Sequence, residues 1–342
     1  MSRLIRYGCI GAGGIARKKH LPGYQKLHEV ELVAVCDVNI ANAQKLGDEF
    51  GVPKVYTDYR EMITAEKLDL VSICTPNNTH TDIAIDAMGL GCHVHVEKPM
   101  ALHAIQAARI AAAERQYGKY VMVGLNKRYQ SESILVERLM KDGFFGEIYQ
   151  VRCGWERSSG IPGSGAWFTN QALSGGGALI DLGVHYLDWA MSILDYPEPV
   201  SIVGSSHNCF LRQGGRIRRG YRSNPNGICN VEDFATGTIK MSTGTILDFT
   251  FSWASNIQEE VQYLEIFGRN GGMTLRNGKL MLFREICGVM FSLVPDIATM
   301  PEAEDEFAHF VSCIQKDVPT KTCAQRSLQT MRMIDQIYAA IS

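Results

Sequence analysis

Residues 5–16 read Ile5-Arg6-Tyr7-Gly8-Cys9-Ile10-Gly11-Ala12-Gly13-Gly14-Ile15-Ala16 and decide the fold. The first half has the apolar character of a buried strand, and a helical stretch follows the glycines. Gly11 allows a tight turn, and Gly13 has no Cβ, so that a pyrophosphate can approach the backbone. Ala16 is small enough for the helix to pack on the strand, while free N–H groups at the helix start favour phosphate. The turn therefore predicts a dinucleotide site.

A second expected strand strengthens this interpretation, because a glycine turn alone is a weak signal. Residues 30–36 form an apolar run that ends in Asp37, which lies twenty-one positions after Ala16. A carboxylate at that place can accept both ribose hydroxyls of the adenosine half. Val38 and Asn39 follow, with no arginine to hold a 2′-phosphate. The sequence therefore predicts NAD as the cofactor, with NADP disfavoured.

Composition limits the remaining classes of protein. The 342 residues suggest two domains, and a net charge of −2 gives no electrostatic support for nucleic-acid binding. No apolar run approaches the ~20 residues of a membrane span, and the first strand begins so early that we expect no signal peptide. Ten cysteines are scattered without a Cys-x-x-Cys pair, which predicts free thiols in a reducing cytoplasm.

The first part of the chain alternates strands and helices, which is typical of a parallel doubly wound sheet. Further strands are expected at 68–74, 93–96 and 120–124, and helices at 41–50, 59–65, 81–90 and 102–116. Ligands of such sheets bind at the carboxyl ends of the strands. Those ends carry residues 11–16, Asp37, residues 75–80, residues 97–99 and Asn126.

The second part has a different pattern. Strands are expected at 148–155, 200–206, 234–241, 245–253 and 261–268, with a turn at 268–272 and helices at 133–141, 178–194, 301–315 and 324–341. Because no helices separate most of these strands, we expect an antiparallel sheet. The boundary falls near residue 125, which gives domains 1–125 and 126–342.

A long glycine-rich stretch interrupts the second part. Residues 156–171 include Ser158-Ser159-Gly160-Ile161-Pro162-Gly163-Ser164-Gly165, flanked by Arg157 and Trp167. Long connections of this kind are often functional, and the flanking aromatic residues favour a loop that covers a substrate. The alternative is a loosely held surface loop.

Asp181, His185 and Asp188 follow a run of three glycines at positions 175–177. Their i, i+4, i+7 spacing places all three on one face of a helix. Histidine exchanges protons near neutral pH, and an aspartate one turn earlier can set its tautomer or bind a substrate hydroxyl. Spacing alone, however, favours a helix with a capped, hydrogen-bonded histidine.

Two further features near the end of the strand at 93–96 allow two interpretations each. Lys98 is either a solvated loop residue or lies where a nicotinamide ring would bind, and Pro99 could hold a cis bond. His93, His95 and Glu97 alternate along the strand and are residue types that bind metals. The intervening valines favour a buried core strand, so we expect no metal.

These motifs together resemble the glucose–fructose oxidoreductase and inositol dehydrogenase (GFO/IDH/MocA) family of sugar oxidoreductases. The matching stretches are residues 11–16, 75–80, 97–99, 124–129 and 175–185. The resemblance implies a Rossmann domain followed by an α+β domain with a large, mainly antiparallel sheet. It also implies a homodimer formed through the open face of that sheet, or a homotetramer made from two such dimers.

The resemblance further implies the site residues. The catalytic ones are Lys98, Asp181 and His185. The residues expected to bind the cofactor are Gly11, Gly13, Gly14, Ile15, Asp37, Thr75, Pro76, Asn77, His80, Glu97 and Asn126. Arg128, Arg157 and Trp167 are expected to contact the substrate. An arginine would suit a phosphate or a carboxylate, but could equally be a plain surface residue.

The predicted activity is reversible oxidation of a ring hydroxyl of a sugar, glycoside or cyclitol, with hydride transfer to nicotinamide. His185 would take the hydroxyl proton, Lys98 would stabilise the developing alkoxide, and Asp181 would orient the substrate. Which of Lys98 and His185 accepts the proton varies in the family. Two alternatives are a nicotinamide-binding regulator without catalysis and a reductase of another small substrate, such as a dihydrodiol or an imine.

Overall fold

The computed structural model describes residues 3–213, 215–300 and 305–341. Their contacts divide the chain into two compact units, each described separately below. The first comprises Met1–Gly124 and Glu304–Leu328, and the second comprises Leu125–Ala303 and Gln329–Ser342. The chain therefore returns to the first unit late in the sequence, a feature that the predicted domains 1–125 and 126–342 do not include.

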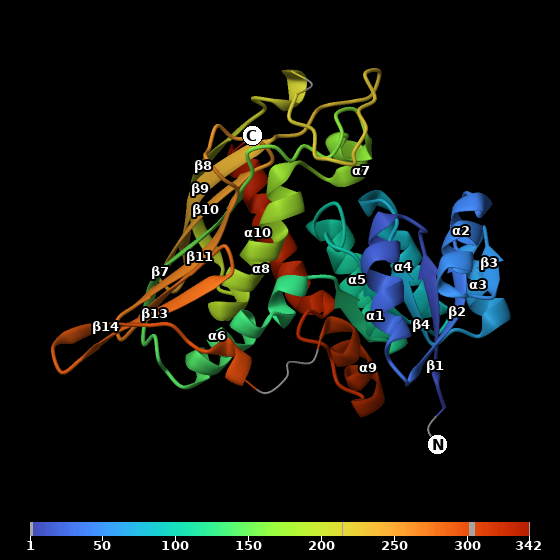
Figure 1. The fold of residues 1–342 in the computed structure, drawn as a ribbon, viewed down its shortest axis with the longest axis horizontal. Coiled ribbons are helices and arrows are strands. Elements are labelled where there is room, and N and C mark those ends of the chain that lie inside the picture. Colours follow the sequence, from blue (N-terminus) through green and yellow to red (C-terminus); the bar gives the residue numbers. More distant parts are fainter. Residues whose placement is uncertain (1–2, 214, 301–304, 342) are drawn as a thin grey trace. The chain divides into compact units, whose positions relative to one another are not determined.

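The first unit contains the predicted parallel doubly wound sheet (Figure 1). Its strand order is β3-β2-β1-β4-β5-β6, and every neighbouring pair is parallel. The strands are β1 (Ile5–Ile10), β2 (Val30–Cys36), β3 (Lys54–Tyr56), β4 (Leu70–Ile73), β5 (His93–Val96) and β6 (Val121–Val123). The order reverses between β1 and β4, and ligands of such sheets bind at this switch point. Only the short edge strand β3 was missing from the prediction.

Helices connect these strands, and polar side chains set where they begin. They are α1 (Leu21–Gln25), α2 (Ile40–Phe50), α3 (Tyr59–Glu66), α4 (His80–Gly89), α5 (Ala104–Tyr117) and α9 (Glu306–Lys316). Asn39 caps α2, and Asp58 caps α3 through two backbone N–H groups. The returning helix α9 packs Phe307 against Gly23, where a Cβ would lie 2.5 Å from the phenyl ring. The predicted helix at 301–315 overlaps α9, but Asp305 is the N-cap of α9 and the helix ends one residue later than predicted, at Lys316. Residues 301–304 lie outside the described part.

The second unit contains an eight-stranded, mainly antiparallel sheet of order β14-β13-β12-β11-β7-β10-β9-β8, in which only β10 and β7 pair in parallel. The strands are β7 (Ile148–Glu156), β8 (Pro199–His207), β9 (Phe234–Met241), β10 (Ile246–Ser252), β11 (Val261–Gly268), β12 (Gly272–Arg276), β13 (Lys279–Ile286) and β14 (Val289–Leu293). The predicted fold class is confirmed for both units.

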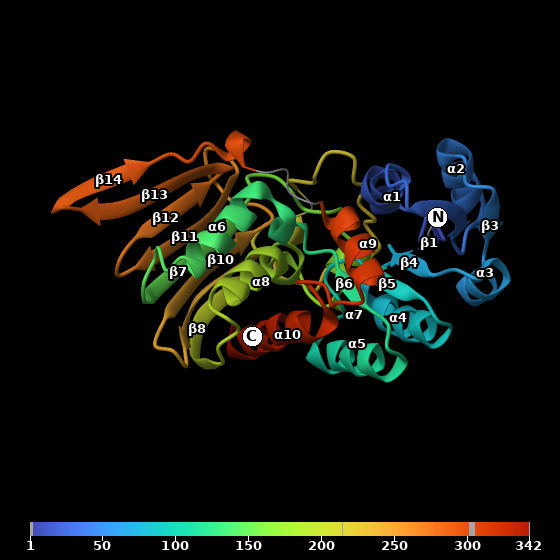
Figure 2. The same ribbon diagram turned by 90° about the horizontal axis from the view of Figure 1, so that it is seen from below.

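Helices cover one face of this second sheet (Figure 2). They are α6 (Ser131–Lys141), α8 (Val184–Ile193) and α10 (Ala324–Ile341), and a short helix α7 (Gln171–Ser174) lies apart from them. The covered face is apolar, with Leu247, Phe249 and Phe251 of β10 buried. On the opposite face Asp248 and its neighbours form polar cross-strand pairs, such as Thr238 to Asp248. This alternation is typical of an antiparallel sheet with one uncovered face.

The sequence interpretation missed strands β12, β13 and β14. Two tight turns join them, at Asn277-Gly278 and Cys287-Gly288, and all four residues have positive φ angles. Such φ angles are typical of type I′ turns, for which Asn-Gly is the strongest short-range hairpin signal. The signal at residues 277–278 was therefore present in the sequence.

No helix in residues 3–213, 215–300 and 305–341 is long and apolar enough to cross a membrane. All ten cysteines are free thiols, and most of them are buried.

Candidate active site

The glycine turn after β1 has the shape that a dinucleotide requires. Gly11 has φ +94°, and a Cβ there would lie 2.7 Å from the carbonyl carbon of Cys74, so only glycine fits. A Cβ on Gly13 or Gly14 would meet nothing within 4 Å, which leaves the backbone open to a ligand. Ala16 is fully buried below the turn. These residues fit the close approach of a pyrophosphate.

Asp37 lies beside this turn at the end of β2. Its Oδ2 accepts a hydrogen bond from the Ala12 N–H at 2.9 Å, and its Oδ1 accepts one from the Asn39 N–H at 2.9 Å. Two backbone donors thus fix the carboxylate next to the place where an adenosine ribose would bind. Each carboxylate oxygen has more than one lone pair, so acceptor capacity remains for ribose hydroxyls.

Glu97 lies under the end of β5 and is buried. Its Oε1 accepts from His20 Nε2 at 2.9 Å, and its Oε2 accepts from the Lys98 N–H at 3.1 Å. Burial alone would raise the pKa of Glu97, but the nearby Lys19 charge and the His20 hydrogen bond hold it well below its usual value. A buried carboxylate therefore anchors the backbone of Lys98, and the Lys98–Pro99 bond is cis.

His80 joins two of the loops predicted to contact the cofactor. Its Nδ1 lies 2.9 Å from the Pro99 carbonyl oxygen and its Nε2 lies 2.9 Å from the Thr75 carbonyl oxygen. The ring is fully buried, and burial lowers its pKa. His80 therefore holds the loops after β4 and β5 together, and a direct contact with the cofactor stays a prediction.

The remaining residues predicted to bind the cofactor differ in exposure. Ile15, Pro76 and Asn126 are exposed, Thr75 is half-buried, and Asn77 is buried. Asn126 belongs to the second unit.

The histidines of β5 have partners within the protein. His95 Nδ1 lies 2.9 Å from the Tyr24 hydroxyl, and His93 stacks on Tyr120 and accepts its N–H. No group of three potential metal ligands occurs among residues 3–213, 215–300 and 305–341.

In the second unit, the glycine run before Asp181 makes room for protein atoms. A Cβ on Gly176 would lie 2.0 Å from the Tyr338 hydroxyl, and one on Gly177 would lie 1.8 Å from the Glu232 carbonyl oxygen. The Glu232 carboxylate accepts from the N–H groups of Gly177 and Leu179, and thus caps the helical segment. The lack of side chains at Gly176 and Gly177 therefore lets Tyr338 and the Glu232 backbone approach this run closely.

The helix that carries Asp181 and His185 is not regular. Leu179–Gly183 form a π-helical turn, and α8 begins only at Val184. The predicted continuous α-helix over 178–194 is therefore wrong in its first turn, because wider turns replace the 3.6-residue period there. Such turns are frequent at functional sites.

Asp181 and His185 are held among tryptophans. Trp253 Nε1 donates to Asp181 Oδ2 at 2.9 Å, and Trp253 itself is fully buried. His185 is 9% exposed, and its ring centroid lies 6.3 Å from that of Trp155. A carboxylate and an imidazole in this apolar setting can orient a hydroxyl and exchange its proton.

Asp188 and Arg128 belong to the core of the second unit. Asp188 accepts from Arg128 Nη1 at 3.2 Å and from the Thr330 hydroxyl at 3.0 Å. Arg128 also contacts Tyr196 and Glu137. Burial alone would lower the pKa of Arg128, but Asp188 and its other partners raise it. These contacts give Arg128 a structural role, and its predicted contact with substrate stays a prediction.

Sequence reasoning missed Lys127, Trp155 and Trp253. Lys127 Nζ donates to Gln262 Oε1 at 3.0 Å and lies over the rings of Tyr186 and Trp155, at 5.3 and 5.7 Å. Burial lowers the pKa of Lys127. Lys127 is part of the stretch 124–129 that carried the family resemblance, whereas nothing in the sequence pattern distinguished the two tryptophans from core residues. The predicted contact residue Trp167 stacks on Phe168, with ring centroids 3.7 Å apart.

Comparisons with known proteins agree with this architecture. Residues 5–125 match the model of an oxidoreductase family with an NAD-binding Rossmann fold, and residues 134–274 match the GFO/IDH/MocA C-terminal domain. The D-glucoside 3-dehydrogenase of Escherichia coli K12 is 36% identical over 287 residues, which cover 81% of each chain. A putative UDP-kanosamine synthase oxidoreductase subunit of Amycolatopsis mediterranei is 31% identical over 80% of this chain and 75% of its own.

A solved structure of levoglucosan dehydrogenase with NADH and L-sorbose superimposes with a TM-score of 0.85, covering 99% of this chain and 97% of the other. Its sequence is 19% identical, so this likeness concerns the fold alone.

Proposed function

The chain belongs to the GFO/IDH/MocA family of oxidoreductases, and we propose that it oxidises a ring hydroxyl of a sugar, glycoside or cyclitol and passes the hydride to NAD. The family assignment makes it a nicotinamide-dependent oxidoreductase. The observation that carries the proposal is the pair Asp181 and His185, held by Trp253 and Trp155 on a capped, irregular helix. Relatives named as D-glucoside 3-dehydrogenase and inositol 2-dehydrogenase support the substrate class.

We assign three catalytic roles. His185 takes the proton of the substrate hydroxyl, because imidazole exchanges protons near neutral pH. Lys98, fixed through its backbone by Glu97, donates to the same oxygen, and its charge stabilises the developing alkoxide. Asp181 binds a neighbouring substrate group, with one of its oxygens already fixed by Trp253. The bound nicotinamide supplies the hydride acceptor.

The substrate test uses the whole protein with NAD and a panel of inositols, aldoses and glucosides. Production of reduced nicotinamide, followed by absorbance, identifies the substrate. Cofactor binding without turnover on every member of the panel would contradict the proposal and favour a regulatory protein.

Asp37 makes NAD the proposed cofactor, and this is a first testable prediction. The carboxylate is held by two backbone donors and would repel a 2′-phosphate. We expect a lower Kd for NAD than for NADP in titrations of both cofactors. Replacing the carboxylate in Asp37→Ser should reduce this preference, and tighter NADP binding by the unaltered protein would refute it.

We also propose a homodimer or homotetramer formed through the uncovered face of the eight-stranded sheet. The exposed apolar side chains of Val203, Met281 and Met290 lie on that face by strand register. Light scattering should give a multiple of the 37.9 kDa chain mass, and a monomer at micromolar concentration would refute the proposal. Ten free cysteines favour a reducing cytoplasm as the place of action.

A further inference from the structure

An arginine-rich segment in the second unit is not explained by the proposed chemistry. Its five arginines are Arg212, Arg216, Arg218, Arg219 and Arg222, and no acidic residue occurs between Glu198 and Glu232. Within the described part of the chain, none of the five is ion-paired with a carboxylate. The segment therefore carries uncompensated positive charge.

This segment is fastened to the glycine-rich loop at 158–165. The Ile161 N–H donates to the Arg216 carbonyl at 3.1 Å, and the Arg218 N–H donates to the Ile161 carbonyl at 2.8 Å. Farther along, the Asn224 N–H donates to the Ser164 carbonyl at 2.7 Å. A Cβ on Gly165 would lie 1.9 Å from the Asn224 carbonyl oxygen, so glycine is required where the two backbones cross. Arg218 is thus held at a defined place on the loop.

Arg157 lies at the start of the same loop, but its side chain is buried. Only 6% of that side chain is exposed. Its stem passes under Gly160, and its guanidinium carbon lies 4.4 Å from the Trp155 ring centroid. Nε pairs with Glu260 at 3.5 Å, whereas Nη1 and Nη2 make no hydrogen bond to another described residue. The four N–H groups of Nη1 and Nη2 therefore remain for a ligand.

Charges of both signs act on Arg157. Burial lowers its pKa, the Asp181 and Glu260 carboxylates raise it, and the Arg218 charge lowers it again. Arg157 therefore lies within electrostatic reach of Arg218 and of Asp181. An anion that reaches both arginines would be attracted by two positive charges.

We propose that Arg157 and Arg218 bind the carboxylate or phosphate group of an anionic sugar substrate while Asp181 and His185 handle its neutral ring hydroxyls. The inference rests on the proposed function, since it names the substrate class of the same site. A planar guanidinium fork matches two oxygens of either group. Trp155 packs against the Arg157 guanidinium at 4.4 Å, and Arg218 adds a second charge from the segment that is fastened to the loop.

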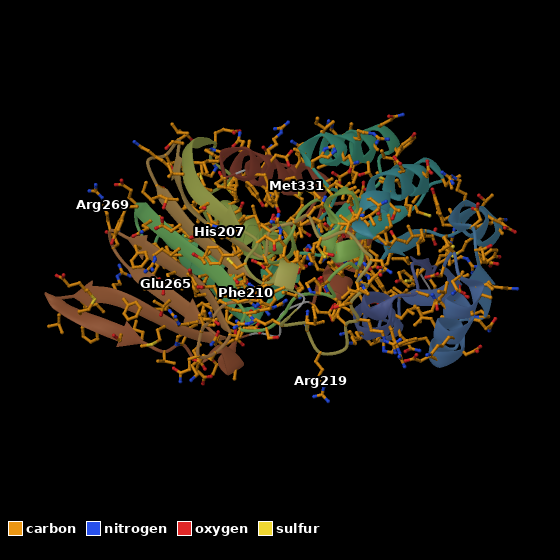
Figure 3. The ribbon with its side chains drawn as sticks, turned by 90° about the horizontal axis from the view of Figure 1, so that it is seen from above. His207, Phe210, Arg219, Glu265, Arg269 and Met331 are labelled. Carbon is orange, nitrogen blue, oxygen red and sulfur yellow. The ribbon has the colours of Figure 1, made fainter. Side chains whose placement is uncertain are left out.

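Arg219 provides a matched control on the same segment. Figure 3 shows its side chain projecting away from the loop into solvent, and it is exposed. Arg218 is exposed as well, so neither Arg218→Gln nor Arg219→Gln should disturb folding. Arg157→Lys keeps the positive charge but loses the planar guanidinium group, whereas Arg157→Gln removes the charge as well.

The binding test follows tryptophan fluorescence of the full chain, because Trp155 contacts the Arg157 guanidinium. Inorganic phosphate and D-glucuronate are titrated into the unaltered protein and the four variants, whose folding is checked by circular dichroism. We expect saturable binding in the unaltered protein and in Arg219→Gln. The Kd should rise at least tenfold in Arg218→Gln and Arg157→Gln. Arg157→Lys should have a Kd between those of the unaltered protein and Arg157→Gln. No saturable binding, or binding that Arg157→Gln and Arg218→Gln leave unchanged, would overturn the inference.

The turnover test compares matched pairs with NAD: methyl glucoside against methyl glucuronide, and glucose against glucose 6-phosphate. A kcat/KM that is at least tenfold higher for a charged member than for its neutral counterpart supports the inference. This preference should be lost in Arg218→Gln and kept in Arg219→Gln. A preference for glucuronide or for the phosphate tells which anion is the natural one. Equal or higher turnover of the neutral members would contradict this inference, but it would not contradict the proposed function. Anion binding without turnover of any sugar would contradict the proposed function alone.

Discussion

Glu97 keeps a negative charge inside the first unit because donors surround it. His20 Nε2 lies 2.9 Å from Oε1, the Lys98 N–H lies 3.1 Å from Oε2, and Lys19 Nζ lies 3.7 Å from Oε1. Lys19 also pairs with Glu306 of α9 at 2.9 Å, which ties the returning helix to the same cluster. Breaking one member of such a buried cluster typically costs about 3–5 kcal/mol. The backbone position of Lys98 is therefore set by buried charges rather than by solvent.

A second prediction, after the one for Asp37, concerns His185. Replacing it in His185→Ala should lower kcat by on the order of 10²-fold, since general base catalysis is worth about 10²–10⁴. NAD binding should persist, because the glycine turn and Asp37 are unaffected. Steady-state production of reduced nicotinamide and a cofactor titration measure the two effects.

His207 is the matched control for this experiment. It is an exposed histidine of β8 in the same unit, labelled in Figure 3. His207→Ala should keep the turnover of the unaltered protein. If His185→Ala also kept it, His185 would have no role as the base.

At the scale of helices and strands, elements with a clear apolar pattern could be predicted from the sequence, whereas short strands without such a pattern could not. Strands β1, β2, β5, β9 and β11 have the predicted bounds, because continuous or alternating apolar runs between turn residues define them. The edge strand β3 has a single aliphatic residue, Val55, and gave no such signal. The hairpin of β12 and β13 needed the Asn277-Gly278 turn to be recognised.

The candidate site divides in the same way. Motif positions such as Lys98, Asp181 and His185 could be proposed from the sequence, whereas the backbone contacts that join Ile161 to Arg216 and Arg218 could not be predicted. Those contacts join two segments without periodicity, far apart along the chain. The same holds for Glu232, whose capping of Leu179 follows from tertiary contacts that no local pattern encodes.

The crossing of the two loops gives a third prediction. Gly165 has φ +74°, and its Cβ position overlaps the Asn224 carbonyl. Gly165→Ala should therefore destabilise the loop pair by about 3 kcal/mol, from backbone strain together with displacement of the second loop. Limited proteolysis between residues 212 and 230 should become faster.

Gly215→Ala is the control, since a Cβ there meets no atom within 4 Å. It should leave the cleavage rate unchanged. Equal rates for Gly165→Ala and the unaltered protein would show that the loops are not held together as described.

At the scale of the whole molecule, buried histidines make stability depend on pH. Burial lowers the pKa of His93 to about 4 and that of His95 well below its usual value, so both stay neutral when folded. In the unfolded chain they titrate near pH 6.5. Below that pH the unfolded state binds more protons, so stability falls as the pH drops.

The expected loss is at most about 1.4 kcal/mol per pH unit for each histidine kept neutral. Glu97 adds a further loss below about pH 4.5, because its folded pKa is depressed. Glu114 acts in the opposite direction, since burial raises its pKa. Urea midpoints measured from pH 7.5 to 5.5 should decrease. The decrease should be smaller in His95→Asn, which retains an acceptor for Tyr24, and a flat profile would contradict the prediction.

The return of α9 to the first unit has a consequence for recombination between relatives. A chimera joined once, near residue 125, would pair the Gly23 surface of one parent with the Phe307 of another, and Lys19 with a foreign Glu306. A chimera that exchanges residues 125–303 together with 329–341 keeps those contacts within one parent, as well as the bonds from Thr330 to Asp188 and from Tyr338 to Glu232. Recombination that exchanges residues 125–303 together with 329–341 therefore leaves the internal contacts of the NAD-binding unit intact.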